Sequence, residues 1–262
     1  MMSRPSVTKF ALAAGFLLVL GAGSVPQAKA DPVLDADTQQ VLSAMSTYLG
    51  GLASFSVDYA TADEVLTTDG QKLQFLHGGS MTLRRPGQMH ATRKGAAGSA
   101  DIVLDGKTIT LFGKQANAYV QIPAASIDEG VDAIHKLGFD APGADLIVSK
   151  PFDLSTADIN TGVHVGMTFI DGIEAHQLAF RGSEVDSQLW VAAGDKPVPL
   201  RYVVTTKWTT AAPQFTLELH NWNLAPAIDG TAFSFTPPAG ATALDPASVT
   251  ANAIGDMTIK GK

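Results

Sequence analysis

Histidine and carboxylate side chains are the residues of this sequence best suited to acid–base catalysis or metal binding, but their spacing favours neither. No histidines follow an H-x-H or HExxH pattern. They are His77, His90, His135, His164, His176 and His220. The closely spaced carboxylate pairs, Asp35 with Asp37 and Glu184 with Asp186, fit helix capping and solvated loops at least as well as catalysis. A hydrolase would require the fold to gather several histidines around a carboxylate.

Other chemical motifs are weak or missing. The segment His77-Gly78-Gly79 is similar to an esterase oxyanion loop, but the sequence has no G-x-S-x-G elbow to accompany it. A glycine-rich bulge in a strand is therefore the better interpretation. The chain has no cysteine, which excludes disulfides, thiolate metal sites and lipid-modified cysteines. We expect no catalytic residue, no metal and no cofactor.

One arginine occupies an unusual place in its strand. In the segment SMTLRRPGQMH, residues 80–90, Met81, Leu83 and Arg85 point to one face and Arg84 to the other. A charged group that continues an apolar row is costly inside a packed core. At the mouth of a cavity it stays hydrated, or it donates to the main chain of a covering helix. We therefore expect Arg85 to act as a latch on such a cover.

A helix and a run of antiparallel strands must position these residues. A capping-box-like segment at Asp37-Thr38-Gln39-Gln40 and apolar residues at helical spacing predict a helix that ends at Gly50-Gly51. From Phe55 the apolar period becomes two, with turns predicted at Asp69-Gly70, Asp105-Gly106 and Asp171-Gly172. The last strand is expected at Phe233-Ser234-Phe235.

A helical insertion interrupts the strands near the middle of the chain. Ser126-Ile127-Asp128-Glu129 is a capping box, and Gly138 is a stop signal. A short apolar helical turn follows from Asp145 to Ser149. The residues expected to form the lid are Ile127, Val131, Ile134, Leu146 and Ile147.

These elements predict an α+β fold. A sheet of eight or more strands with few helices tends to curl. We therefore expect an open antiparallel β-barrel, or half-barrel, with an N-terminal helix and a helical lid insertion over its concave face. The expected domain spans residues 31–243, and residues 244–262 are expected to be a loose C-terminal tail.

The N-terminus resembles a secretory signal peptide. Arg4 and Lys9 precede an uncharged run, and Ala28-Lys29-Ala30 forms an A-x-A cleavage site, so residues 1–30 are expected to be removed. Of 18 Lys and Arg residues, three lie in this segment, which leaves 15 against 25 Asp and Glu. Such an acidic surface argues against nucleic-acid partners. We expect a periplasmic protein with no integral membrane segment after cleavage, with secretion to the exterior as the alternative.

The strands carry more apolar side chain than one small helix can cover. Either these residues form an ordinary core, or they line a partly hollow barrel that holds a hydrophobic ligand. The position of Arg85 favours the cavity. The residues concerned are Phe55, Phe75, Met81, Leu83, Met89, Tyr202, Val204 and Trp208.

Three stretches together resemble the periplasmic lipoprotein carrier (Lol) family. Leu83–Gly87 followed by Asp105–Thr108 resembles that family's strand-RP-strand-DGKT run. Phe233–Gly240 is similar to its closing F-x-F-x-P-P-x-G strand, and Leu52–Phe55 to the junction of its first helix and strand. The chain as a whole is similar to an uncharacterised family of predicted periplasmic proteins with this carrier-like fold.

The resemblance implies an open barrel with a helical lid, whose apolar cavity takes lipid acyl chains. It implies that Arg85 bonds to the lid and holds the empty carrier closed. Ile109 and Leu111, which continue the alternation, stand where the family has aromatic residues and are also expected in the lining. The expected function is a soluble carrier for a lipid or a lipoprotein acyl chain. The alternative is a non-catalytic interaction or envelope-stress sensor module on the same fold, with an envelope protein as its partner.

Overall fold

The strands of the protein form one large sheet, seen here in a computed structural model that describes residues 32–249 except 97, 140–142 and 155–156. The predicted signal peptide and the end of the predicted tail lie outside the described residues. The strand order is β1-β8-β9-β10-β11-β12-β2-β3-β4-β5-β6-β7-β13. The strands are β1 (Val33–Leu34), β2 (Ser54–Leu66), β3 (Lys72–Arg84), β4 (Gln88–Gly95), β5 (Gly98–Asp105), β6 (Thr108–Gly113), β7 (Ala118–Pro123), β8 (Thr161–Ile170), β9 (Ile173–Arg181), β10 (Val185–Ala192), β11 (Pro199–Thr206), β12 (Gln214–Asn223) and β13 (Thr242–Leu244).

The sheet is mostly antiparallel and open, which confirms the predicted fold class. Its two edges are β1 and β13, and each of these short strands pairs in parallel with its neighbour, β8 or β7. β12 pairs with β2, so the second half of the chain continues the sheet that the first half begins. Turns lie at the predicted Asp-Gly pairs, and Gly70, Gly106 and Gly172 all have a positive φ.

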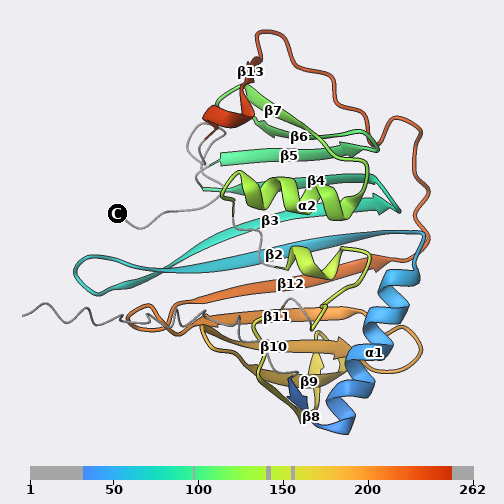
Figure 1. Cartoon of the computed structure of the whole chain (residues 1–262), viewed down its shortest axis with the longest axis vertical. Helices are drawn as coiled ribbons and strands as arrows, with labels where there is room; N and C mark the ends of the chain where they lie inside the picture. The colour runs from blue at the N-terminus through green and yellow to red at the C-terminus, as the bar shows by residue number, and fades with distance from the viewer. Residues whose placement is uncertain (1–31, 97, 140–142, 155–156, 250–262) are drawn as a thin grey trace, which may run out of the picture. The chain divides into compact units, whose positions relative to one another are not determined.

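Helix α1 (Ala36–Gly51) lies beside β8 to β11 in Figure 1. Its N-cap is Asp35, whose carboxylate accepts a 2.7 Å hydrogen bond from the Thr38 N–H. This corrects the predicted start of the capping motif at Asp37, which lies in the first turn instead. The same Asp35 carboxylate also accepts from the His164 N–H at 2.8 Å and so ties α1 to β8.

The insertion between β7 and β8 contains helix α2 (Ile127–Lys136) and the 3₁₀ turn η1 (Ala144–Leu146). The predicted capping box is present, because the Ser126 hydroxyl accepts from the Glu129 N–H at 3.1 Å. The Glu129 carboxylate in turn accepts from the Ala125 N–H at 2.7 Å. Figure 1 shows α2 lying across β3 to β5 on one face of the sheet.

The C-terminal part differs from the sequence expectation. Residues 233–235, predicted as the last strand, form turns and irregular backbone. Phe233 is buried beneath the Arg84 guanidinium, and Phe235 packs against Phe112 and Tyr119. The paired edge strand is β13, and the 3₁₀ turn η2 (Pro246–Ser248) follows it at the start of the expected tail.

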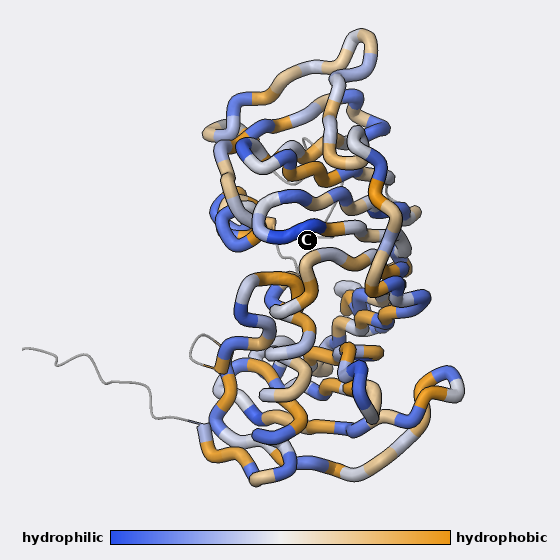
Figure 2. Tube along the Cα trace, turned by 90° about the vertical axis from the view of Figure 1, so that its right-hand side faces the viewer, coloured by the Kyte–Doolittle hydropathy of each residue, from blue (hydrophilic) through white to orange (hydrophobic). Residues whose placement is uncertain are grey.

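The main core lies between the sheet, α1 and the insertion. Apolar and polar positions alternate along much of the sheet, as the colours of Figure 2 show. Fully buried members include Phe55, Leu83, Leu104, Ile109 and Leu111. Burial of each such side chain contributes about 1.5–3 kcal/mol relative to exposure.

Candidate functional site

An apolar cavity of about 180 Å³ lies between the sheet and the insertion. Its floor comes from β2, β3, β4, β5 and β12, with Pro199 at the start of β11, and its cover from α2, Gly143 and η1. Because β12 pairs with β2, strands from both ends of the domain meet under the cover. The arrangement is that of a pocket beneath a lid.

Six of the residues predicted for the site line this cavity. Met81 and Met89 belong to the sheet, while Val131 and Ile134 of α2 and Leu146 and Ile147 of the η1 segment form its cover. Sequence reasoning did not select the other strand residues of β2, β4, β5 and β12 that line the cavity. These are Val57, Tyr59, Thr61, Ala91, Arg93, Ile102, Phe215, Leu217, Leu219 and Trp222.

Five other predicted residues are packed into the core. They are Phe55, Leu83, Ile109, Leu111 and, on the lid helix, Ile127, and each is at most 1% exposed. The Phe55 ring lies 5.1 Å from that of Trp222, which does line the cavity. These residues therefore lie behind the cavity wall.

The remaining predicted residues lie elsewhere. Phe75 is on the outer part of the β2–β3 hairpin, beyond His77, where the pairing of β3 with β4 begins. Tyr202 packs edge-on against Phe152, and Val204 is half-buried on the same strand. Trp208 is 74% exposed in the turn after β11, so its expected place in the lining is corrected.

Arg85 reaches the lid from the end of β3. Its Nη1 donates to the Ile147 carbonyl at 2.9 Å, and its Nη2 lies 3.4 Å from the Leu49 carbonyl in the last turn of α1. The guanidinium therefore connects the lid to α1 through main-chain oxygens. Burial lowers the pKa of Arg85, and the nearby Asp128 carboxylate opposes that shift. Arg85 Nε is buried without a hydrogen-bond partner among the described residues.

Two further contacts hold the lid together near Arg85. The Ile127 N–H at the start of α2 donates to the Pro86 carbonyl at 2.8 Å. The Asp128 carboxylate accepts from the Ser149 N–H at 2.8 Å and from its hydroxyl at 2.5 Å. Asp128 thus ties α2 to the segment that Arg85 holds.

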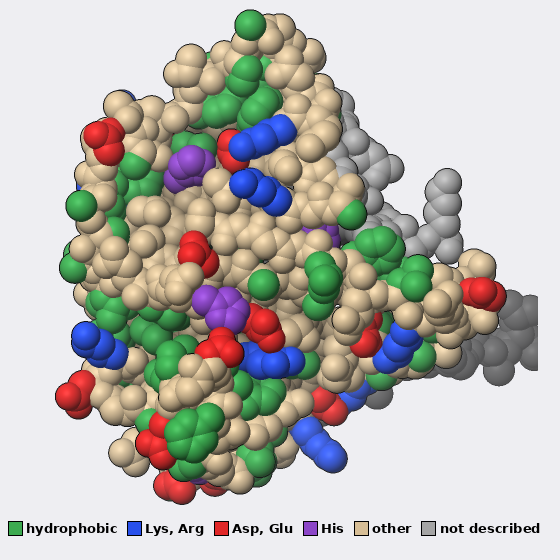
Figure 3. Space-filling view, turned by 180° about the vertical axis from the view of Figure 1, so that it is seen from behind, with side chains coloured by type: hydrophobic (Ala, Val, Ile, Leu, Met, Phe, Trp, Pro, Cys, Tyr) green, Lys and Arg blue, Asp and Glu red, His purple; other side chains and the backbone are tan. Residues whose placement is uncertain are grey.

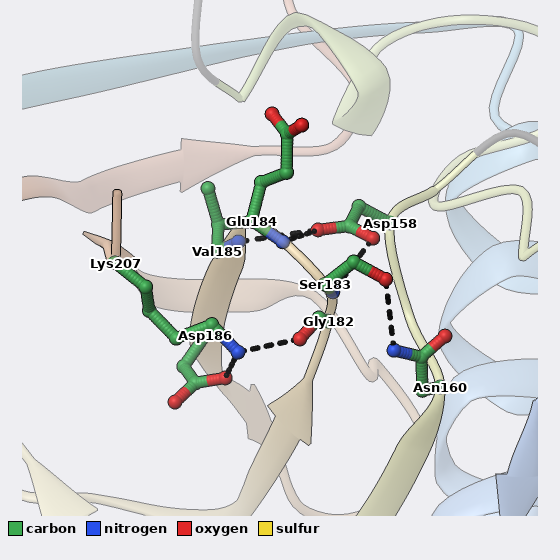
Figure 4. A network of polar contacts seen from close by, with 8 residues as sticks. All are labelled: Asp158, Asn160, Gly182, Ser183, Glu184, Val185, Asp186 and Lys207. Carbon is green, nitrogen blue, oxygen red and sulfur yellow. Dashed lines mark hydrogen bonds and ion pairs between the residues drawn. The ribbon is translucent and has the colours of Figure 1, made fainter. Parts of the chain in front are cut away.

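The end of the insertion is anchored to the β9–β10 turn, as Figure 4 shows. The Asp158 carboxylate accepts from the N–H groups of Ser183, Glu184 and Val185 at 2.7–3.1 Å. In the same network Asp186 lies 2.9 Å from Lys207 Nζ, while the Glu184 side chain points away. The pair Glu184 and Asp186 therefore forms no carboxylate dyad.

One corner of the cavity is polar. The Tyr59 hydroxyl donates to the Thr92 carbonyl at 2.7 Å, and burial raises the pKa of Tyr59 against the opposing charge of Arg93. Gly79 leaves the space for this contact, because a Cβ there would lie 1.8 Å from the Thr92 oxygen and 2.9 Å from the Tyr59 hydroxyl. Arg93 Nη2 lies 3.8 Å from the Asp63 carboxylate.

A carboxylate also sits within the lid. Asp145 is part of η1, and burial raises its pKa, while the charge of His135 opposes the shift. Burial likewise raises the pKa of Tyr202, and the Asp145 charge adds to that shift. Deprotonation of Asp145 therefore places a poorly solvated charge in the cover of the cavity.

The histidines are distributed over several small contacts. His164 Nε2 lies 3.1 Å from His176 Nδ1, His77 Nδ1 lies 3.2 Å from Asp63, and His220 Nδ1 lies 3.1 Å from Asp171. Within residues 32–249 and outside the gaps, no three His, Asp or Glu side chains are grouped as metal ligands. In the same described part of the chain, no helix combines the length and apolar character needed to cross a bilayer.

Comparison with known proteins identifies the family. Residues 38–245 match the family described as "Predicted periplasmic protein (DUF2092)". The match covers more than half of the chain and agrees with the periplasmic location expected from the N-terminus. No curated protein matches the sequence.

Solved structures with a similar course of the chain are distant in sequence. An uncharacterised conserved protein from Thermus thermophilus is 11% identical, covers 79% of this chain and 98% of its own, and has a TM-score of 0.49. LprF from Mycobacterium bovis is 15% identical, with coverage of 78% and 100% and a TM-score of 0.47. A LolA superfamily protein from Nitrosomonas europaea is 13% identical, with coverage of 75% and 97% and a TM-score of 0.38.

All three TM-scores are below 0.5, so the assignment rests on the sequence match over residues 38–245. The open sheet, the covered cavity and the Arg85 contacts belong to that matched segment. The chain belongs to the DUF2092 family of predicted periplasmic proteins.

Proposed function

We propose that this periplasmic protein is a non-catalytic carrier for a hydrophobic ligand, such as a lipid or the acyl chain of a lipoprotein. The observation that carries the proposal is the apolar cavity beneath a lid that Arg85 holds to α1. Capture of an apolar chain needs no chemistry, only removal of its surface from water.

The cavity is small compared with a long acyl chain. An engineered protein cavity of about 150 Å³ accommodates benzene. The cavity here, at about 180 Å³, is of similar size and too small for a long acyl chain. Uptake of a chain therefore requires the lid to move away from the sheet, and Arg85 has to release the Ile147 carbonyl for that movement.

The energies allow such a cycle. Burying about 12 methylenes contributes a gross free energy of about 10 kcal/mol. Ordering of the chain and opening of the lid reduce this gain, and micromolar affinity requires only about 8 kcal/mol. Contacts re-formed between Arg85 and the main chain favour the empty state and assist release.

Native mass spectrometry of the mature protein, purified from periplasm without detergent, tests the proposal. We expect an acyl species bound in stoichiometric amount, or bound after incubation with lipids and acylated peptides. Ala91 lines the cavity and is 8% exposed, so Ala91→Phe should fill the space and abolish binding while circular dichroism stays unchanged. A mass without ligand after incubation with every acylated probe would refute the carrier.

A specific surface feature favours a second candidate, the protein-interaction module. β8 exposes a row of apolar side chains, and Figure 3 shows hydrophobic side chains at the end of the molecule where β8 and β9 lie. The exposed residues are Val163, Val165, Met167, Phe169 and Ile173. On its outer side, β8 pairs with β1 at Thr161 and Gly162. The remaining edge suits the addition of a strand from a partner protein.

The two proposed functions predict that different molecules co-purify with the protein from envelope extract. A carrier should co-purify with lipid, whereas an interaction module should co-purify with a protein. Phe169→Ser, at a side chain 67% exposed, should remove a protein companion and leave bound lipid unchanged. If Phe169→Ser retains both the co-purifying protein and the bound lipid, β8 is not the contact surface.

A further inference from the structure

The polar corner of the cavity indicates the chemistry of the ligand. Three polar side chains line the cavity among the described residues, namely Tyr59 and Thr61 from β2 and Arg93 from β4. Most of the other lining residues are aliphatic or aromatic, and apart from the Trp222 indole none of those described has a polar side chain. An apolar chain with a polar end therefore matches the cavity better than a pure hydrocarbon.

Arg93 is the charged member of this corner. Its side chain is 20% exposed, and its Nη2 lies 3.8 Å from Asp63 Oδ2, at the long limit of an ion pair. The same Asp63 oxygen lies 3.2 Å from His77 Nδ1. A guanidinium has five N–H donors, and a mostly buried charge is costly unless it is paired. An anion in the cavity would pair with it at close range.

Thr61 is a second, independent indication of a polar ligand group. Thr61 is one of the lining residues, it is 7% exposed, and its Oγ1 is buried without a hydrogen-bond partner among the described residues. A buried hydroxyl without a partner is unfavourable. Tyr59 differs, because its hydroxyl already donates to the Thr92 carbonyl and is held in place by it.

We propose that Arg93 and Thr61 bind the carboxylate of a single-chain amphiphile, a fatty acid, whose acyl chain extends beneath the lid. The inference rests on the proposed carrier function and specifies its ligand. The planar guanidinium matches a carboxylate with two parallel hydrogen bonds, and Thr61 supplies a third donor. Arg93 is the one charged side chain among the described lining residues, which matches the single carboxylate of a fatty acid.

Ligands of equal chain length and different heads test this proposal. Binding of dodecanoate, dodecanol and dodecyl phosphate to the mature protein is measured by calorimetry below their micelle-forming concentrations. We expect dodecanoate to bind at least about tenfold tighter than dodecanol, which corresponds to about 1.4 kcal/mol. Arg93→Met retains the apolar stem, so it should reduce the ratio of dodecanoate to dodecanol affinity to about one.

A matched control distinguishes a specific effect of Arg93 from the effect of removing any positive charge. Arg201 lies 3.1 Å from Glu218 and is not a lining residue, so Arg201→Met should keep the preference for dodecanoate. Equal binding of dodecanoate and dodecanol by the wild type would overturn the inference and leave the carrier function intact. Tighter binding of dodecyl phosphate than of dodecanoate would overturn the carboxylate assignment. Failure of all three ligands to bind would overturn both the inference and the carrier function.

Discussion

Two arginines reach the interior of this protein from the same sheet, but their surroundings differ. Arg85 Nη1 donates to the Ile147 carbonyl at 2.9 Å and its Nη2 lies 3.4 Å from the Leu49 carbonyl, so main-chain oxygens engage two of its nitrogens, while its Nε has no partner among the described residues. Arg93 lies in the cavity lining, and the carboxylate of Asp63 is 3.8 Å away. The first arginine has main-chain partners in the closed protein, whereas the second is the one for which we propose a partner from outside.

Each arginine ends an apolar row of a strand, so the sequence pattern alone suggests the same role for both. Their different surroundings suggest that one holds the lid and the other contacts the ligand. A guanidinium bound to main-chain oxygens stabilises one arrangement of the lid. A guanidinium with weakly engaged donors selects what enters beneath that lid. Substitutions at each position should therefore separate lid stability from ligand choice.

The largest expected effect comes from adding a side chain at Gly79, beside the polar corner of the cavity that contains Arg93. In Gly79→Ala the new Cβ would lie 1.8 Å from the Thr92 oxygen, which is a backbone atom, so the strands must shift. We expect a loss of about 3 kcal/mol in the free energy of unfolding, at the upper end for overpacking. Urea denaturation measures this loss.

Gly78→Ala is the matched control for that substitution. A Cβ at Gly78 meets its nearest neighbour, the Tyr59 carbonyl oxygen, at an ordinary 3.5 Å. Its unfolding free energy should stay within about 1 kcal/mol of the wild type. Equal losses for the two variants would show that the corner at Gly79 is not tightly packed around Tyr59 and Thr92.

Removal of the Arg85 head group should have the next largest effect. Arg85→Met leaves the Ile147 carbonyl without its donor, which should lower stability by about 2 kcal/mol. The ligand should also leave more slowly, because the contacts that favour the empty state are lost, and hydrogen exchange at residues 144–149 of the empty protein should increase. Arg84→Met is the control, because Arg84 lies on the other side of the strand over the Phe233 ring. Unchanged exchange and release in Arg85→Met would remove the latch.

The alternation of side chains between the two faces of a strand explains which parts of this fold and site the sequence could predict. Alternation located most strands, and the Asp-Gly pairs marked three of their turns. Parity also placed Arg85 on the interior side, where the structure finds it. These features depend on neighbours in sequence, because side chains two residues apart share a face.

The pairing of β12 with β2 is not local, and it decides which apolar residues line the cavity. For this reason Phe215 and Leu217 were not selected, while Ile109 and Leu111, of suitable parity, proved to be core. Arg93 continues the row of Met89 and Ala91 as Arg85 continues that of Leu83, so the same pattern was available for it. Trp208 was misplaced because β11 ends at Thr206.

The lid carboxylate gives a smaller, pH-dependent effect. Burial raises the pKa of Asp145 above its ordinary 3.8, so the folded state binds this proton more tightly than the unfolded chain. Its contribution is most favourable below 3.8 and declines as the pH rises toward the raised pKa. Tyr202 and His135 are the titratable groups whose charge interactions with Asp145 shift a pKa.

Asp145→Asn should therefore weaken the decline in lid stability with rising pH, measured by hydrogen exchange of residues 144–149 from about pH 4 to pH 7. Asp132→Asn, at an exposed position of α2, should keep the wild-type profile. If the Arg85 contact alone controls the lid, the Asp145→Asn profile will match the wild type as well.

The smallest effect is expected at the tryptophan that lies outside the cavity. Trp208 is 74% exposed, so Trp208→Phe should change the free energy of unfolding by less than about 0.5 kcal/mol. Trp222 lines the cavity, and its Nε1 donates to the Pro199 carbonyl at 3.1 Å. Binding of dodecanoate should change the emission of Trp222, so Trp208→Phe keeps this signal and Trp222→Phe loses it. A signal lost in Trp208→Phe would place the ligand at the β11 turn, away from both Arg85 and Arg93.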